Sequence, residues 1–314
     1  MTTTFNTMSA KLSKTAKQQA FGLCFFVILA IFAGFATGPS AAAKAKGTAQ
    51  RAPARIISLI PAVSEMLFSL GVGPTVVAVS SFDDYPPDVL KLPRVGALLD
   101  PDLERILALR PDLVIVYESQ VDLRRQLERA MVPMFVYKHA GLADVTTTIR
   151  QLGTRVGRDE EAAAVVGRIE AALADIRRRV AGRPRPRTLL VFGRDALTLR
   201  GIYASGGIGF LHDMLDRAGG DNVFGDMKQQ SVQATSELIL ARRPDVILEL
   251  RAGDMTPQQR RKEIAVWQGL PSVPAVQTGR ISIITDPRTV VPGPRVAEGT
   301  ERIARALHPE AFTR

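Results

Sequence analysis

The sequence predicts an α/β protein made of two β/α lobes with mostly parallel sheets, a long helix joining them, and a cleft between them. Short apolar strands alternate with helical patterns over residues 55–141 and again over residues 187–314. The residues between, 142–186, lose the strand pattern and become helical. An internal repeat places one helix–strand element in each half, so we expect two lobes.

The N-terminus has the layout of an export signal. Residues 1–43 combine three lysines, an apolar run from Phe21 to Phe35 and a small-residue stretch, which is typical of a signal peptide. The apolar run is about 15 residues, whereas a membrane-spanning helix needs about 20. Residues 44–54 are expected to form a flexible tether. We therefore expect a periplasmic protein, with an uncleaved membrane anchor as the alternative.

Charge and composition exclude several functional classes. The formal net charge is +10, and residues 1–50 hold five lysines and no acid, which leaves +5 on residues 51–314. The remaining arginines are interspersed with acids, so nucleic acid is not an expected partner. The only cysteine, Cys24, lies in the apolar run, so the exported chain has no thiol for a disulfide, a metal or a nucleophile. The three histidines lack catalytic or metal-binding spacing, so we predict no catalytic residue, no metal site and no cofactor.

The first lobe, residues 55–141, is predicted as a β/α series. Each strand is a short apolar run, and each helix carries apolar residues at helical spacing. Gly71 ends the first helix, and Pro111 follows the second, in which Pro101 falls in the first turn. The strands are expected at residues 56–60, 76–79, 113–116 and 134–137, and the helices at 63–70, 100–109 and 121–130.

The bridging segment, residues 142–186, is predicted to contain one long helix. Asp159 can cap a helix that continues to Val180, a length of about 30 Å at 1.5 Å per residue. The β/α alternation then resumes with residues 188–192, 210–218, 246–250 and 281–285. A glycine-rich stretch from Tyr203 to Phe210 precedes a helix. A plain turn is its simpler interpretation, and an anion site is the alternative.

The internal repeat consists of residues 104–115 (ERILALRPDLVI) and residues 237–248 (ELILARRPDVIL). Seven residues are identical in register, at an offset of 133 residues. Each copy predicts a helix stopped by Arg-Pro and followed by a buried strand. The repeat therefore favours a duplicated architecture over a chance match.

Aromatic and cationic residues follow the predicted strands, where open α/β sheets bind ligands. They are Phe82, Tyr85, Tyr117, Arg194 and Arg251. Arginine pairs with carboxylate or phosphate, and aromatic rings provide flat apolar contact. Together they predict a site for a large, partly anionic ligand.

Three segments resemble the periplasmic binding proteins of ABC importers for iron complexes and vitamin B12. They are residues 55–71 (RIISLIPAVSEMLFSLG), 81–87 (SFDDYPP) and 103–115 (LERILALRPDLVI), and residues 218–224 (AGGDNVF) extend the match. The resemblance covers about residues 55–308 and is nearest to the vitamin B12-binding member. It implies two lobes bridged by one rigid helix, with only small closure on binding.

The resemblance also implies partners and site residues. Glu104 and Glu237, one in each lobe, would dock onto arginines of an ABC permease dimer that works with its ATPase, and the protein would act as a monomer. By the same resemblance, the cleft would involve Pro61 and Ala62 after the first strand, Leu98, and the loop 286–288 after the last strand. With the loop residues above, the expected ligand residues are Pro61, Ala62, Phe82, Tyr85, Leu98, Tyr117, Arg194, Tyr203, Arg251, Asp286 and Arg288.

The ligand stays open among cobalamin, heme and a ferric siderophore. The vitamin B12 binder carries tryptophan at the position of Leu98. Heme-binding relatives bind iron by tyrosine or histidine, a role open to Tyr85, Tyr117 or His139. Siderophore binders use arginines, which Arg194, Arg251 and Arg288 could supply. The leading hypothesis is a solute-binding protein that catalyses nothing, and the alternative is a periplasmic enzyme or ligand sensor on the same scaffold.

Overall fold

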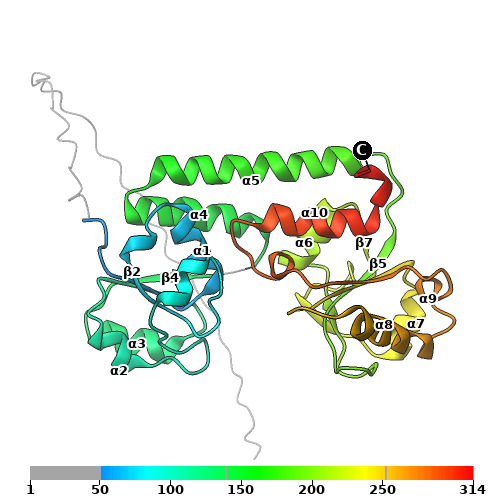
Figure 1. Cartoon of the computed structure of the whole chain (residues 1–314), viewed down its shortest axis with the longest axis horizontal. Helices are drawn as coiled ribbons and strands as arrows, with labels where there is room; N and C mark the ends of the chain where they lie inside the picture. Colours follow the sequence, from blue (N-terminus) through cyan, green and yellow to red (C-terminus); the bar gives the residue numbers. More distant parts are fainter. Residues whose placement is uncertain (1–50, 139, 252, 314) are drawn as a thin grey trace, which may run out of the picture. The chain divides into compact units, whose positions relative to one another are not determined.

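The computed structural model describes residues 51–138, 140–251 and 253–313, which belong to one compact unit spanning Gln50–Arg314 (Figure 1). The predicted signal peptide and most of the predicted tether lie outside the described residues, as does His139. Within this unit the chain forms two sheets and a set of long helices.

The first sheet, which we call sheet A, is fully parallel and has the strand order β2-β1-β3-β4. Successive residues of β3 alternate between two hydrophobic clusters, one on each face, as expected of a parallel strand covered by helices on both sides. We call residues 56–137 the N-lobe. Its elements are β1 (Ile56–Ser58), α1 (Pro61–Ser69), η1 (Gly73–Thr75), β2 (Val76–Val79), η2 (Pro87–Lys91), α2 (Leu103–Ala108), β3 (Leu113–Tyr117), α3 (Val121–Arg129) and β4 (Met134–Tyr137).

The second sheet, sheet B, is mixed. Strands β10, β9 and β5 are parallel, β7 pairs parallel with β5, and β6 and β8 add an antiparallel edge. The sequence did not predict β6 or β8 because each has three residues and no apolar run. We call residues 187–313 the C-lobe. Its elements are β5 (Arg187–Gly193), β6 (Tyr203–Ser205), α6 (Phe210–Arg217), β7 (Asp221–Asn222), β8 (Ser231–Gln233), α7 (Ser236–Arg242), β9 (Val246–Leu250), α8 (Pro257–Ala265), η3 (Val266–Gly269), α9 (Pro274–Gln277), β10 (Ile281–Ile284), η4 (Pro287–Thr289), α10 (Val296–Leu307) and η5 (Pro309–Ala311).

The segment between the sheets forms two helices: the long helix predicted to end at Val180 is present, and a second helix that the sequence did not single out precedes it. They are α4 (Leu142–Val156) and α5 (Asp159–Val180), separated by Gly157 in a left-handed conformation with φ 67°. Asp159 is the first residue of α5, not its cap. Helix α5 packs on α4 and on α10, as Figure 1 shows. A buried apolar stripe at helical spacing marks α4, but three consecutive threonines weaken its helical signal.

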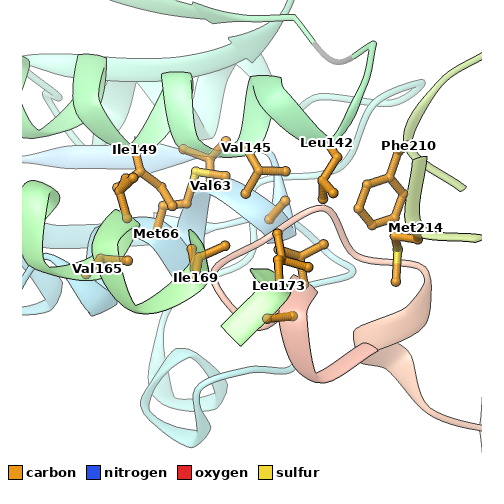
Figure 2. Close-up of a cluster of buried hydrophobic side chains, with 14 of the residues drawn as sticks. Val63, Met66, Leu142, Val145, Ile149, Val165, Ile169, Leu173, Phe210 and Met214 are labelled. Carbon is orange, nitrogen blue, oxygen red and sulfur yellow. The ribbon is translucent and has the colours of Figure 1, made fainter. Parts of the chain in front are cut away.

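One hydrophobic cluster runs from the N-lobe through the bridging helices into the C-lobe (Figure 2). Val63 and Met66 of α1 lie against α4, whereas Phe210 and Met214 belong to α6. Helix α5 contributes its buried stripe to the same cluster, including Ile169. The lobes therefore share their largest core and do not stand as two independently packed domains.

The internal repeat is a structural duplication. Arg110 and Arg243 both adopt φ 47° after α2 and α7, where each turns the chain toward a proline and a central strand. Asp112 accepts hydrogen bonds from the backbone N–H groups of Ala54 and Arg55, at 2.8 Å each. In the C-lobe, Asp245 accepts one from the backbone N–H of Arg187 at 3.1 Å. Equivalent residues thus join each repeat to the strand beside it.

Helix α2 begins at Leu103, and the prediction that Pro101 lies in its first turn was wrong. The Asp102 carboxylate accepts a hydrogen bond from the Arg105 backbone N–H at 2.9 Å and caps the helix. The preceding residues instead fold against Gly96, where a Cβ atom would lie 2.1 Å from the Asp100 carbonyl oxygen. That close approach requires glycine and holds Pro101 outside the helix.

Removing the Asp112 carboxylate is expected to destabilise the N-lobe. Asp112→Ala should lower the free energy of unfolding by about 1–2 kcal/mol, since two backbone N–H groups lose a charged acceptor. Urea denaturation measures this change. Asp88→Ala removes an exposed carboxylate paired with Lys91 and should change it by less than about 0.5 kcal/mol. Equal stability of the two variants would contradict the assigned role of Asp112.

Candidate functional site

A cavity of about 340 Å³ lies between the lobes at the carboxyl ends of the sheet A strands. Predicted ligand residues Pro61 and Ala62 begin α1, which starts after a two-residue connection from β1, and Tyr117 ends β3. The C-lobe closes the other side with apolar side chains. The full lining is Ile60, Pro61, Ala62, Tyr117, Tyr137, Phe210, Val290, Val291 and Pro292.

Two tyrosines form the aromatic wall of this cavity. Tyr117 and Tyr137 pair across β3 and β4, with ring centroids 6.0 Å apart and planes at 65°. Burial raises the pKa of both phenols, and the negative charge of Asp83 adds to the effect on Tyr117. Both side chains are therefore uncharged at neutral pH. The sequence reasoning missed Tyr137, although it ends its strand as Tyr117 does.

The loop after β2 presents Phe82 to solvent by burying the residue beside it. The Asp83 carboxylate accepts hydrogen bonds from the backbone N–H and the hydroxyl of Ser80, at 2.9 and 2.5 Å. Asp83 is buried, and that burial raises its pKa against the opposing effect of its hydrogen bonds. Phe82 is left 74% exposed, which makes it available for apolar contact.

Leu98 lies on a second exposed loop of the N-lobe, which a buried glutamine holds in place. The Gln120 side chain accepts a hydrogen bond from the Tyr117 backbone N–H at 3.0 Å and donates one to the Leu98 carbonyl at 3.1 Å. The loop is thus tied to the end of β3, beside the cavity. Gln120 is a positioning residue that the sequence did not suggest.

The glycine-rich stretch after β6 is explained by close backbone packing. A Cβ atom at Gly206 would lie 2.0 Å from the Gln229 carbonyl oxygen. A Cβ atom at Gly207 would lie 2.2 Å from the Gly225 carbonyl oxygen. The N–H groups of Gly206 and Gly207 also donate to backbone carbonyls within the C-lobe. These contacts support the plain-turn interpretation over an anion site.

Tyr203 lies at the carboxyl end of β5, where it pairs with Gly193. Its ring is half exposed and lies beside Phe192, with centroids 6.5 Å apart. Tyr203 is therefore placed at a strand end, as the predicted ligand residues of the N-lobe are.

Arg194 is enclosed in the C-lobe, with a side chain that is 0% exposed. Its Nε and Nη2 atoms donate to Glu249 Oε1 at 3.0 Å each, and Nη2 lies 2.8 Å from the Glu263 carboxylate. Its Nη1 donates to the carbonyls of Asp195 and Thr198. The protein occupies all three nitrogens of this guanidinium group. Arg194 therefore has no free donor for a ligand, in contrast to the sequence-based expectation.

The other two arginines predicted for the cleft are also paired with carboxylates. Arg251 Nη2 lies 3.1 Å from Glu249 Oε2 and 3.6 Å from Glu263 Oε2. Arg288 donates to Asp286 through Nε and Nη2, at 2.8 and 2.6 Å, and to Glu298 through Nη1. The hydrogen bonds from Arg288 lower the pKa of Asp286. All three predicted arginines thus have their charge balanced by the protein.

Glu104 and Glu237 occupy equivalent exposed positions in the first turns of α2 and α7. Asp102 caps α2, and Thr235, at the same offset as in the repeat, caps α7. Hydrogen bonds from its own backbone N–H and from the Thr235 hydroxyl lower the pKa of Glu237. The duplication therefore gives each lobe one exposed glutamate at the same place in its fold.

The described residues contain neither a metal-binding cluster nor a membrane-spanning helix. No cluster of three or more histidine, cysteine, aspartate or glutamate side chains there has the geometry to hold a metal ion. Among the same residues, no helix combines the length and apolar character needed to cross a membrane.

Comparison with known proteins identifies relatives of this chain. Residues 56–287 match the family model described as periplasmic binding protein. The vitamin B12-binding protein of Salmonella typhimurium strain LT2 is 31% identical over 228 residues, covering 71% of this chain and 80% of the relative. A Bacillus subtilis protein named as an uncharacterized ABC transporter substrate-binding lipoprotein is 28% identical over 270 residues, covering 84% of this chain and 83% of the relative.

Solved structures share the fold. The periplasmic vitamin B12-binding protein of Vibrio cholerae aligns with a TM-score of 0.70 at 23% identity, covering 84% of this chain and all of that one. The periplasmic heme-binding protein of Roseiflexus sp. RS-1 aligns with a TM-score of 0.69 at 24% identity, covering 83% of this chain and all of that one. The two-lobed architecture expected from the sequence is confirmed.

Proposed function

Since this chain belongs to the periplasmic binding protein family, we propose that it captures a corrinoid or metal chelate between its lobes and delivers it to an ABC importer. Among the ligands that the sequence left open, we place cobalamin first. Heme and ferric siderophores are the alternatives that the experiment below separates from it.

The pairing of the predicted arginines carries this choice. Arg194, Arg251 and Arg288 each contact at least one carboxylate of the protein. At Arg194, a ligand carboxylate would have to displace a protein carboxylate and leave it unpaired in a buried site, which is costly. At Arg251 and Arg288, the neighbouring protein carboxylates already offset the charge that would attract an anionic ligand. The aromatic and apolar cavity wall instead suits flat apolar contact with a ligand whose edge carries uncharged amide groups, as the edge of cobalamin does.

The proposed ligand residues follow from these positions. The cavity wall supplies Pro61, Ala62 and Tyr117, joined by Tyr137. The exposed loops and strand ends supply Phe82, Tyr85, Leu98 and Tyr203. Arg251, Asp286 and Arg288 remain proposed rim residues with balanced charge, and Arg194 is left out because its donors are occupied.

Titration of the exported chain tests this proposal, with thermal unfolding and absorbance as readouts. The probes are cobalamin, heme, a ferric hydroxamate and a ferric catecholate. Cobalamin at 100 times its dissociation constant should stabilise the fold by about 2.7 kcal/mol, a visible rise in melting temperature. Tyr117→Ala should diminish this rise, because Tyr117 lines the cavity, whereas Leu240→Ala on α7 should not. If an anionic chelate binds and cobalamin does not, cobalamin is rejected as the ligand. If none of the four probes binds, the proposed class of ligand is rejected.

The paired glutamates are proposed to dock onto the permease. Glu104→Ala combined with Glu237→Ala should reduce uptake of radiolabelled cobalamin by about tenfold or more and leave cobalamin affinity unchanged, because exposed charges guide association. Glu128→Ala with Glu160→Ala removes the same charge from α3 and α5 and serves as the control. Normal uptake by the first double variant would rule out the docking role.

Export by residues 1–43 is proposed from the sequence pattern. Mass spectrometry of the protein recovered from the periplasmic fraction should find an N-terminus close to residue 44. An intact Met1 in a membrane fraction would identify an uncleaved anchor instead.

A further inference from the structure

A largely buried ion pair joins the two lobes, and neither of its residues is among the proposed ligand residues. Arg295, which precedes α10, donates from Nε to Glu65 Oε2 at 2.9 Å and from Nη2 to Glu65 Oε1 at 2.5 Å. Glu65 lies in α1 and is 4% exposed. The two partners are 230 residues apart in the chain.

The same guanidinium group holds the ring of Tyr85. The Arg295 Cζ atom lies 3.6 Å from the centroid of the Tyr85 ring, within the range of a cation–π contact. The Tyr85 hydroxyl has no hydrogen bond to any described residue. Arg295 of the C-lobe is therefore a principal contact that orients Tyr85 of the N-lobe. We call these three residues the Glu65–Arg295–Tyr85 clamp.

The clamp lies where the lobes meet along α1. Residues 290–292 and the start of α1 line the interlobe cavity described above. Farther along α1, Phe68 and Ser69 line a second cavity of about 340 Å³ with Tyr85 and Pro294. Between them, a Cβ atom on Gly293 would lie 3.1 Å from Glu65 Oε2, so the absence of a side chain permits the close approach. All three clamp residues line this second cavity, so the clamp forms part of a cavity wall to which both lobes contribute.

The clamp is better suited to fix geometry than to add stability. Burial raises the pKa of Glu65, and the Arg295 guanidinium opposes that rise. A buried ion pair gains little net stability, because the loss of hydration offsets the attraction of the charges. A two-pronged contact between arginine and carboxylate, however, fixes both distance and angle.

We infer that Arg295 is a positioning residue that sets the separation of the two lobes and the orientation of Tyr85 before the ligand arrives. The inference rests on the proposed function only in treating Tyr85 as a ligand residue. The ligand then meets a cleft that is already arranged, which lowers the cost of binding. The charge of Arg295 stays with Glu65 and is not offered to the ligand.

The test measures the distance between the lobes without ligand. Spin labels are attached to cysteines introduced into the exported chain, which has no cysteine of its own, at Glu128 of α3 and Arg261 of α8, both exposed. The test variant is Arg295→Met combined with Glu65→Gln, which removes the pair without leaving a buried charge. The control is Arg305→Met with Glu301→Gln. Arg305 also pairs with a glutamate and lies over an aromatic ring, Phe312 at 4.8 Å, but all three groups belong to the C-lobe.

The wild type and the control should show one narrow distance distribution, whereas the test variant should show a broader or displaced one. If the arranged cleft falls to about a tenth of the population, the dissociation constant for cobalamin rises about tenfold. A single Arg295→Lys variant should recover little of the narrow distance distribution or of the cobalamin affinity, because lysine lacks the planar guanidinium fork. An unchanged distribution in the test variant would overturn the inference, and so would a broadened distribution with unchanged affinity. If the wild type binds none of the probes, the proposed function fails, and the distance distribution alone decides whether Arg295 sets the lobe separation.

Discussion

Arg194→Ala is expected to lower the free energy of unfolding by about 3–5 kcal/mol, the range for removing one partner of a buried ion pair. The substitution leaves the carboxylates of Glu249 and Glu263 to share Arg251 alone. It also removes a hydrogen bond to the Glu263 carbonyl and a cation–π contact with Trp267. Urea denaturation followed by far-ultraviolet circular dichroism measures the loss.

Two further variants separate this explanation from a ligand role. Arg194→Met with Glu249→Met removes both charges and should cost less than the two single substitutions summed, because the residues are coupled. Arg168→Ala removes an exposed arginine from α5 and should change stability by less than about 0.5 kcal/mol. A stable Arg194→Ala variant that has lost ligand affinity would return Arg194 to the ligand site.

Ile149→Ala is expected to lower the free energy of unfolding by about 2–5 kcal/mol, the usual cost of emptying space in a packed core. Ile149 is fully buried in α4, within the hydrophobic cluster that both lobes share. Leu99→Ala deletes a side chain that is 92% exposed and should have little effect. The two substitutions remove similar side-chain volumes, so the difference between their effects on the free energy of unfolding measures the contribution of burial.

The Ile149→Ala variant also tests coupling between the lobes, because the chain's only tryptophan reports on the C-lobe. Trp267 lies in a separate hydrophobic cluster of the C-lobe, away from Ile149. Because the larger cluster joins the lobes, Trp267 fluorescence and circular dichroism should give coincident unfolding curves, both moved equally by Ile149→Ala. If Ile149→Ala leaves the midpoint of the tryptophan fluorescence transition unchanged, the C-lobe unfolds independently of the shared cluster.

The strands of sheet A and the central strands of sheet B could be predicted because their signals are local. A parallel strand covered on both faces is a short apolar run, as in β3 and β9. The short strands β6 and β8 could not be predicted, because their pairing depends on neighbours distant in sequence. Helix α4 carries a buried stripe that a count of helical spacing would have detected, despite its threonines.

The candidate site was predictable in its location and less so in its chemistry. Pro61, Ala62 and Tyr117 follow strands, and they do line the interlobe cavity. Arg194 also follows a strand, yet it lies inside the C-lobe. Its position after β5 can be predicted from the local sequence. Its partners, Glu249 of β9 and Glu263 of α8, are distant in sequence, so no local pattern predicts the pairing.

The sequence by itself determined the two-lobed α/β architecture, the duplicated element and the family resemblance, because these depend on periodicity and on motifs within short segments. Only the tertiary structure decided which charges are free. Glu65 and Arg295 are separated by 230 residues, and Arg194 and Glu249 by 55. A guanidinium group has the same local sequence signature whether solvent, a ligand or a buried carboxylate surrounds it. The physical difference lies in burial and pairing, which depend on contacts that only folding creates.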